Sequence, residues 1–314
     1  MTAPEPLFRH EALFYRDPAG YLEGVVPFVR SGLAAEETVV VAVPPPDGEL
    51  IRAALGPQSR RVRFLDMARI GRNPGRIIPT FLVAFADTRP EAGVRLVGEP
   101  IWPGRSAGEY PACVQHEALI NLAFAGRRFA AVCPYDAARL DPAVLTDAGT
   151  THPVIVEAGD RRASPSYTDP ATVVGAFDRP PLEAPATAVR LRVHANALGV
   201  ARRTVAAHAS AAGLEPARAA DLALAVNEIV TNSLLHAGTA ATLSIWCEDG
   251  SRDNASIVCQ VEDSGELTDL LAGRIPPARD ATGGHGLVLV NHLCDLVRIC
   301  RVSDGLTIRL QMNL

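Results

Sequence analysis

The sequence predicts two domains, an N-terminal α/β domain with a mainly parallel sheet and a C-terminal α+β domain. With 314 residues, 48% hydrophobic and 21% charged, the chain is long enough and apolar enough for two separate cores. Helical and continuous apolar strand patterns alternate in the first half, as in sheets with right-handed crossovers. In the second half, paired helices and hairpin-linked strands favour a two-layer sandwich, in which helices cover one face of an antiparallel or mixed sheet.

Four short apolar runs in the first half have the length and flanks of buried strands. They lie at 38–43, 62–65, 94–97 and 129–136. Helical spacing of apolar residues predicts helices at 17–35, 48–55, 76–87 and 110–125. The first of these strands continues as VPPPDGE, which contains no glycine-rich phosphate loop. This domain is therefore not expected to bind a nucleotide through a P-loop.

A segment rich in Pro, Ala and Asp separates the two halves, and residues 161–186 are predicted to be a proline-stiffened linker. Its apolar spots, Val173, Val174 and Phe177, are expected to dock on a domain. Beyond the linker, strands are predicted at 189–193, 242–248, 256–263, 296–302 and 306–312. Helices are predicted at 196–212, from Pro216 to just before Gly238, and from the glycines at 283 and 284 onward. Asp304–Gly305 is expected to form the turn between the last two strands.

Composition excludes several classes of function. A net charge of −5 and a pI near 5.9 give no electrostatic case for a nucleic-acid partner. The chain contains no Lys, which excludes a Walker A lysine and a Schiff base. Its six cysteines form no C-x-x-C pair, which favours reduced thiols over a disulfide framework or a zinc site. Neither a signal peptide nor an apolar run of roughly 20 residues is recognisable, so a cytoplasmic protein without a membrane span is expected.

Polar residues follow two of the predicted parallel strands, where open α/β sheets bind their ligands. Glu99, Trp102 and Arg105 follow the strand at 94–97, and Asp66 and Asn73 follow the strand at 62–65. The next helix carries HEALI, which is not the H-E-x-x-H of a zinc protease. His116 and Glu117 are therefore expected to be helix-packing and surface residues.

Five segments of the first half resemble the MEDS sensory domain. They are HEALFY from His10, PFVRSGLAAEETVVVAVPPP from Pro27, GRNPGRIIP from Gly71, GEPIW from Gly98 and HEALIN from His116. The resemblance covers roughly residues 8–160. It implies a RecA-like α/β fold without the nucleotide loop and a sensor of a small-molecule signal that the sequence does not identify. We predict that the sensor pocket contains His10, Glu99, Trp102, Arg105 and His116.

The most distinctive stretch of the second half is AVNEIVTNSLLHA, from Ala225 to Ala237. On a helix, Glu228, Asn232 and His236 share one stripe, because each lies four residues after the last. The opposite face is formed mainly by apolar residues: Leu222, Val226, Ile229, Val230, Ser233 and Leu234. An ordinary surface helix is the alternative interpretation of this segment alone.

Two later motifs favour a nucleotide site over that alternative. Asp263–Ser264–Gly265 places a carboxylate at a strand end, next to a glycine that lets the backbone approach a ligand. The segment from Gly283 to Leu287 opens a helix whose free N–H groups and dipole favour phosphate. Each motif alone is common by chance, but their order and context together predict nucleotide binding.

This arrangement is similar to the Bergerat-type ATP-binding fold of gyrase, histidine kinases and MutL, and in particular to bacterial anti-sigma-factor serine kinases, over residues 187–314. The resemblance implies ATP and Mg²⁺ as cofactors, with Glu228 acting on the attacking hydroxyl and Asn232 as a Mg²⁺ ligand. It implies that Asp263 and Gly265 contact adenine. Residues that would surround the phosphates are Gly284, His285, Gly286 and Leu287. His236, near the helix end, is expected to be a cap or packing residue.

The resemblance also implies a function: a signal-responsive anti-sigma regulator. Its partners would be a sigma factor, a STAS-type anti-anti-sigma protein phosphorylated on Ser or Thr, or both. Such kinases often pair as homodimers, and the sequence does not fix the oligomeric state. Two departures from the family pattern lie near the base: Leu267 replaces the second Gly of D-x-G-x-G, and Leu306 follows Gly305 where Thr is usual. Thr307 is one residue late and is expected to point to the other face of the sheet.

Two alternatives remain open at this point. The departures at Leu267 and Leu306 leave room for a nucleotide-sensing or protein-binding module without catalysis. A histidine kinase is the other alternative, but a phosphoacceptor helical hairpin is not recognisable before the second domain, where the proline-rich segment lies and His194 ends a strand.

Overall fold

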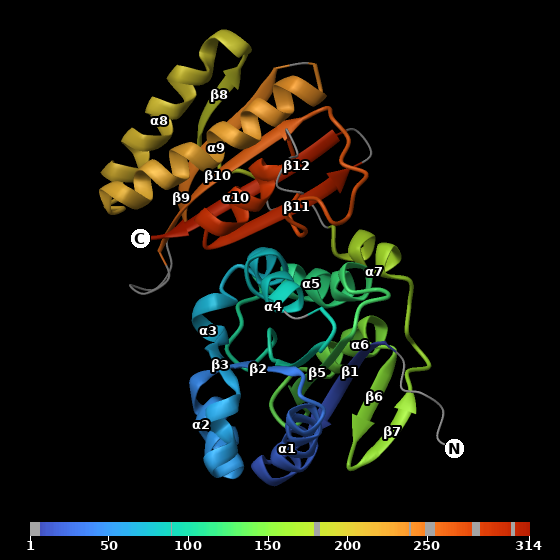
Figure 1. Cartoon of the computed structure of the whole chain (residues 1–314). Helices are drawn as coiled ribbons and strands as arrows, with labels where there is room; N and C mark the ends of the chain where they lie inside the picture. Colours follow the sequence, from blue (N-terminus) through green and yellow to red (C-terminus); the bar gives the residue numbers. More distant parts are fainter. Residues whose placement is uncertain are drawn as a thin grey trace. The chain divides into compact units, whose positions relative to one another are not determined.

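A computed structural model describes residues 7–88, 90–178, 183–238, 240–248, 255–277, 283–302 and 305–314. The chain divides into two compact units, Met1–Val174 and Gly175–Leu314 (Figure 1). None of the described helices combines the length and the apolar character needed to cross a bilayer.

The N-terminal unit is built on a seven-stranded sheet with the order β3-β2-β4-β5-β1-β6-β7. Its strands are β1 (Phe8–Tyr15), β2 (Thr38–Val43), β3 (Arg63–Asp66), β4 (Val94–Gly98), β5 (Phe129–Asp136), β6 (Val154–Glu157) and β7 (Asp160–Ala163). All neighbouring strands pair in parallel except β7, which runs antiparallel to β6. The predicted α/β class with a mainly parallel sheet is therefore confirmed.

Helices lie between most of these strands in the sequence, and one more helix follows β7. They are α1 (Pro18–Ala34), α2 (Pro45–Leu55), α3 (Met67–Ile70), α4 (Val83–Thr88), α5 (Tyr110–Ala123), α6 (Pro142–Thr151) and α7 (Pro170–Phe177). The predicted helix at 76–87 is irregular: a 3₁₀ turn at Pro74–Arg76 leads into a π-helical segment, Ile77–Leu82, before α4 begins. Pro79 lies inside the π segment and has no N–H to donate, which disfavours a regular α-helix there.

The predicted linker at 161–186 contains regular secondary structure. It includes most of β7 and all of α7, in which Val173 and Val174 are buried. The side-chain amide of Gln115 donates a hydrogen bond to the carbonyl of Val174 at 3.3 Å. The expectation that the apolar part of this segment docks on a domain therefore holds for these two valines.

The C-terminal unit is a five-stranded antiparallel sheet with the order β11-β12-β10-β9-β8. Its strands are β8 (Val189–Val193), β9 (Ala241–Glu248), β10 (Ser256–Asp263), β11 (Leu296–Val302) and β12 (Gly305–Asn313). Its helices are α8 (Leu198–Ala211), α9 (Pro216–His236) and α10 (His285–Leu293). The predicted hairpin of the last two strands is present, with Val302 paired to Gly305, which is the first residue of β12; Asp304, the other residue of the predicted turn, lies outside the described residues.

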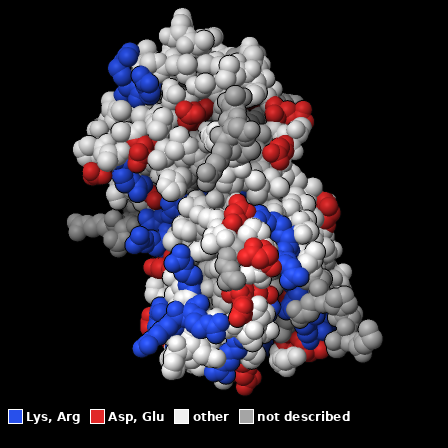
Figure 2. Space-filling view, in the orientation of Figure 1, with Lys and Arg blue, Asp and Glu red and all other residues white. Residues whose placement is uncertain are grey.

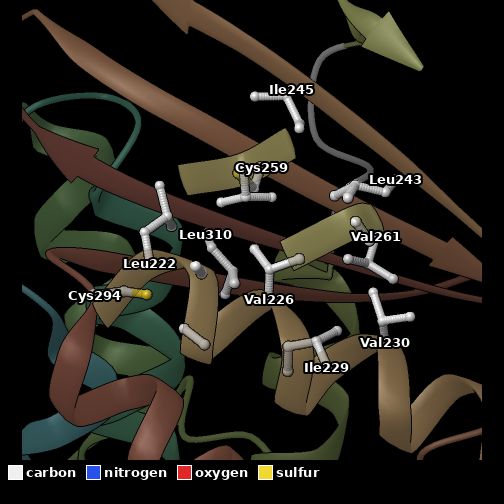
Figure 3. Close-up of a cluster of buried hydrophobic side chains, with 14 of the residues drawn as sticks. Leu222, Val226, Ile229, Val230, Leu243, Ile245, Cys259, Val261, Cys294 and Leu310 are labelled. Atoms are coloured by element: carbon white, nitrogen blue, oxygen red, sulfur yellow. The ribbon is translucent and has the colours of Figure 1, made fainter. Parts of the chain in front are cut away.

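One core joins the helices to one face of this sheet. Leu222, Val226, Ile229 and Val230 of α9 pack against alternate residues of the strands (Figure 3). The sheet contributes Leu243, Ile245, Cys259, Val261 and Leu310 to this core. The predicted antiparallel sheet with helices on one face is confirmed, and α9 lies directly on it with its apolar stripe buried.

Charged side chains of both signs are distributed over the surface of the N-terminal unit. Arginines and acidic residues are interspersed on the face shown in Figure 2. This distribution agrees with the modest net charge of −5.

Candidate functional site

Helix α9 positions the first two candidate residues. Pro216 occupies its first turn, and the helix continues to His236 with the predicted apolar stripe buried. On the other stripe, Glu228 and Asn232 are half-buried, and His236 is exposed. The half-burial of a carboxylate and an amide one turn apart distinguishes this helix from an ordinary surface helix, whose polar face is fully solvated.

The start of α10 lies against these two side chains. A Cβ atom added to Gly286 would lie 3.1 Å from Glu228 Oε2 and 3.3 Å from Asn232 Nδ2. Gly284, the residue before α10, has φ of +86°, in the left-handed region that glycine adopts without strain. Glycine at 286 therefore allows the close approach of α10 to these side chains, and glycine at 284 allows the left-handed turn that precedes α10.

Asp263 ends β10 and organises the next part of the site. Its Oδ1 accepts a hydrogen bond from the backbone N–H of Gly265 at 2.7 Å. A Cβ on Gly265 would lie 2.8 Å from the same oxygen and 3.3 Å from Ala237 Cβ, just beyond α9. Gly305 lies so close to Asp263 that a Cβ added to Gly305 would lie 2.0 Å from the carbonyl oxygen of Asp263. The Gly265 N–H thus orients the Asp263 carboxylate, and Gly305 allows the neighbouring strand to approach the Asp263 backbone.

These three segments surround one cavity of about 650 Å³, within the range of small-molecule sites. Its polar lining includes Asn232, His236, Asp263, Glu266 and Asp269. The apolar lining comprises Ile229, Leu267, Leu271, Ile275, Leu287, Leu306 and Ile308. Gly265, Gly284 and Gly286 also line it, so all three predicted motifs meet here. His236, expected to be a cap or packing residue, is instead an exposed residue of the cavity wall.

Both departures from the family pattern lie on this cavity. The side chains of Leu267 and Leu306 extend its apolar wall. The carbonyl of Leu267 accepts a hydrogen bond from Arg301 Nε at 2.9 Å, and Arg301 also pairs with Asp178 at 3.0 Å. Thr307 pairs with Glu262 in the ladder, between Leu306 and Ile308, which line the cavity. It therefore faces the opposite side of the sheet, as the alternation predicted.

In the N-terminal unit, the five predicted sensor-pocket residues lie in different places. Trp102 and Arg105 line a shallow cavity, and the guanidinium of Arg105 stacks on the Trp102 ring at 4.3 Å. Glu99 is buried, and the hydroxyl of Tyr21 donates to its Oε2 at 3.5 Å. Burial raises the pKa of Glu99 well above its usual range. His10 and His116 are buried elsewhere in the unit, and His116 lines a separate, very small cavity.

Glu117 is not a surface residue, contrary to expectation, and His116 is buried as well. Both side chains lie on α5, which is buried along most of its length, with 0% of Glu117 exposed. Glu117 accepts a hydrogen bond from the Tyr135 hydroxyl at 3.3 Å and contacts His10 Nε2 at 3.1 Å. Sequence reasoning failed here because a helix covered on nearly all sides shows no polar stripe to mark its solvent face.

Two residues beside Glu117 were not predicted at all. Cys133 on β5 and His152, directly after α6, are buried with their side chains near the carboxylate. Burial lowers the pKa of His10 to about 4 and that of His152 to about 3, and it raises the pKa of Glu117. At neutral pH, both imidazoles are therefore uncharged. Only the isolated HE pair in an apolar helix could have signalled this cluster in the sequence.

Two family descriptions match the chain. The family described as "MEDS: MEthanogen/methylotroph, DcmR Sensory domain" matches residues 9–153. The family described as "Histidine kinase-like ATPase domain" matches residues 191–312. A search among curated proteins finds no match. The chain thus consists of a MEDS sensory domain followed by a histidine kinase-like ATPase domain.

Proposed function

We propose that the C-terminal domain binds ATP and Mg²⁺ in the 650 Å³ cavity and serves as the output of an anti-sigma regulator controlled by the N-terminal domain. The observation that carries the proposal is the meeting of Glu228 and Asn232 with Gly286. Glu228 and Asn232 lie more than 50 positions before Gly286 in the sequence, yet a Cβ added to Gly286 would lie only 3.1 Å and 3.3 Å from their side chains. In this proposal the domain is a Bergerat-type ATP-binding fold.

The residues present fit the nucleotide and its metal ion. The apolar wall formed by Leu267, Leu306 and Ile308 suits the faces of a purine, and Asp263 suits its exocyclic amino group. The N-terminal turn of α10, with Gly284 and Gly286, suits phosphate oxygens, because the helix dipole favours negative charge there. Asn232 offers an amide oxygen of the kind that Mg²⁺ accepts. When bound there, Mg²⁺ would neutralise charge on the phosphates.

Side chains of the protein would supply the other roles in phosphate transfer. Glu228 lies one turn from Asn232 and faces the first turn of α10, where it can orient a hydroxyl and accept its proton. His285 and Leu287 flank Gly286 at the phosphate end. We propose that the phosphate acceptor is a Ser or Thr hydroxyl of a STAS-type anti-anti-sigma protein, and that a sigma factor is the other partner.

The protein substrate can be tested by phosphate transfer. The full chain would be incubated with labelled ATP, Mg²⁺ and candidate anti-anti-sigma proteins. Glu228→Ala should lose transfer by at least about tenfold, in line with removal of a general base. Glu215→Ala, an exposed carboxylate at the start of the same helix with no side-chain cap hydrogen bond, should keep it. Transfer that survives in Glu228→Ala would contradict the proposed kinase chemistry.

A second candidate function is ATP sensing without transfer. The observation that favours it is the position of Leu267 and Leu306, which replace small or polar residues on the cavity wall. Calorimetry that finds tight ATP binding to the wild type, with no transfer to any candidate, would support it. A histidine kinase is disfavoured because the described residues between α7 and β8 contain no helical hairpin.

A further inference from the structure

The N-terminal domain contains a compact group of four side chains with metal-ligating atoms. His10 comes from β1, Glu117 from α5, Cys133 from β5 and His152 from the end of α6. All four are buried, and their ligand atoms lie within 4.8 Å of one another. This group is separate from the cavity of the C-terminal domain, so the inference does not depend on the proposed function.

Four of the six separations between ligand atoms are close to those of a tetrahedral metal site, and the other two are no longer than 4.8 Å. His10 Nε2 lies 3.1 Å from Glu117 Oε2 and 3.5 Å from Cys133 Sγ. Glu117 Oε2 lies 3.5 Å from Cys133 Sγ and 3.6 Å from His152 Nε2. In a tetrahedral zinc site with ordinary bond lengths, neighbouring ligand atoms are separated by about 3.3–3.6 Å. The side chains are therefore already near the positions that a central ion requires.

Hydrogen bonds outside the group orient both imidazoles toward its centre. Asn121 donates its amide N–H groups to the backbone carbonyls of Glu117, Ala118 and Thr151, so its Oδ1 remains as an acceptor. His10 Nδ1 lies 3.2 Å from that oxygen, and His152 Nδ1 lies 2.9 Å from the carbonyl of Ala148. Both Nδ1 atoms are therefore donors, which leaves the Nε2 lone pairs facing inward. This is the arrangement by which metal-binding histidines are held in proteins.

Without a cation, one of these lone pairs has no hydrogen-bond partner. Both Nε2 atoms face the same oxygen of Glu117, at 3.1 Å from His10 and 3.6 Å from His152, and the Cys133 thiol lies 3.5 Å from His10 Nε2. His152 Nε2 has no hydrogen-bond partner among the described residues, although it is fully buried. A buried polar atom without a partner costs roughly 1–3 kcal/mol, and such atoms are uncommon in folded proteins. One central cation would accept all four lone pairs.

We propose that His10, Glu117, Cys133 and His152 bind one divalent first-row transition-metal ion, with Zn²⁺ the best fit. Two nitrogens, one sulfur and one oxygen form a borderline-soft ligand set that suits Zn²⁺ better than Mg²⁺ or Ca²⁺. On binding, the thiol of Cys133 and the carboxyl of Glu117 each release one proton, so two negative ligands balance the 2+ charge. The resulting neutral centre can remain buried at low cost.

The surroundings predict a closed site. Glu117 and Cys133 also line a small apolar cavity, together with Ile77 and Phe81 of the π-helical segment. Its volume of about 10 Å³ has room for roughly one water molecule. In this conformation the ion would hold β1, α5, β5 and α6 together without accepting a larger external ligand.

The test uses the full chain, stripped of metal by a chelator under reducing conditions and reloaded with Co²⁺ as a spectroscopic substitute for Zn²⁺. The wild type is expected to bind one equivalent. Its spectrum should show the intense visible bands of tetrahedral Co²⁺ and the near-ultraviolet charge-transfer band of a cobalt–thiolate bond, and Zn²⁺ should displace both. Binding of less than about 0.1 equivalent, or a cobalt spectrum without the thiolate band, would overturn the proposal.

Variants identify the thiol. Cys133→Ala should abolish the thiolate band, and His152→Gln should weaken Co²⁺ affinity by at least about tenfold. Two controls should keep the band: Cys113→Ala, which removes another buried thiol of the same unit, and Cys247→Ala, which removes the exposed thiol. Loss of the band in Cys247→Ala would mean adventitious surface binding and would overturn the assignment. The wild-type spectrum remains decisive if Cys133→Ala fails to fold.

Discussion

At the scale of single residues, the candidate ATP site depends on glycines as much as on acidic and amide side chains. Gly286, Gly265 and Gly305 each lie where an added Cβ would meet a neighbour at 3.1 Å or less. The neighbours are the carboxylate of Glu228 and the side-chain and backbone oxygens of Asp263. These glycines therefore set how closely the backbone approaches the two acidic residues to which we assign functions.

Gly286→Ala should impair the site without unfolding the domain. The new methyl group would displace the side chains of Glu228 and Asn232 by a few tenths of an ångström. We expect Mg²⁺–ATP affinity to fall by at least about tenfold, because displacing the Asn232 amide removes a metal contact that the proposal assigns to it. Isothermal titration calorimetry measures this loss. Gly283→Ala is the matched control, since a Cβ there meets no atom within 4 Å; equal losses in both variants would refute the explanation.

Asp263→Asn should weaken adenine recognition. The amide can still accept the hydrogen bond from Gly265 through its oxygen, but the negative charge that favours the adenine amino group is lost. A loss of about 1–3 kcal/mol in ATP binding is expected. Glu262→Gln, at the preceding and exposed position of the same strand, is the control. Calorimetry measures the ATP affinity of both variants. Equal affinities would contradict a contact between Asp263 and the base.

At the scale of elements, α9 links the core to the site. Its buried stripe packs on the sheet, and its half-buried stripe carries Glu228 and Asn232. The sequence predicts this helix well because Pro216 and Gly238 mark its limits and the apolar period is regular. The strands of this domain were also predicted closely, since their alternation and hairpin pairing are local signals.

Three strands of the N-terminal unit are not predicted from the sequence, for physical reasons. Strand β1 contains the buried polar residues His10 and Glu11, so its apolar pattern is broken. Strand β7 reads DRRA and is exposed along its whole length, so it contains no apolar run, and β6 has a single buried residue, Ile155. The four-residue group at positions 10, 117, 133 and 152 could not be predicted, because only the parallel sheet and its crossovers bring such distant residues together.

Leu222→Ala tests the core under α9. Leu222 is fully buried, so truncation should leave a cavity and lower the free energy of unfolding of the C-terminal domain by about 2–5 kcal/mol. Leu235→Ala removes the same atoms from the same helix, but at a position that is 72% exposed. Its effect should stay within about 0.5 kcal/mol. Chemical denaturation gives both values, and similar losses would contradict the described orientation of α9.

At the scale of the whole molecule, the chain joins two compact units with separate cores. Each unit contains one of the two tryptophans, Trp102 in the first and Trp246 in the second. Fluorescence of single-tryptophan variants can therefore follow each unit within the intact chain. A sensor-and-output protein requires two such units, each able to respond to its own ligand.

Mg²⁺–ATP should stabilise the unit that contains Trp246. At a free concentration 100 times the Kd, binding to the native state adds about 2.7 kcal/mol to the free energy of unfolding. The Trp102→Phe variant, in which Trp246 alone reports, should show the larger shift in its unfolding transition. The Trp246→Phe variant, in which Trp102 reports, should show the smaller one. A larger shift of the unfolding transition reported by Trp102 would mean that the nucleotide binds the N-terminal unit, which would contradict the proposal.

In the proposed function, the C-terminal cavity binds ATP through Mg²⁺ at Asn232. Calorimetric titration of Mg²⁺–ATP into the full chain measures it most directly, with Asn232→Ala as the test and the exposed Asn196→Ala as the control. Wild type and control are expected to bind one nucleotide with an affinity that falls when Mg²⁺ is removed. Asn232→Ala should bind at least about tenfold more weakly and lose that dependence on Mg²⁺. Absence of binding to the wild type, or equal binding by Asn232→Ala, would contradict the claim.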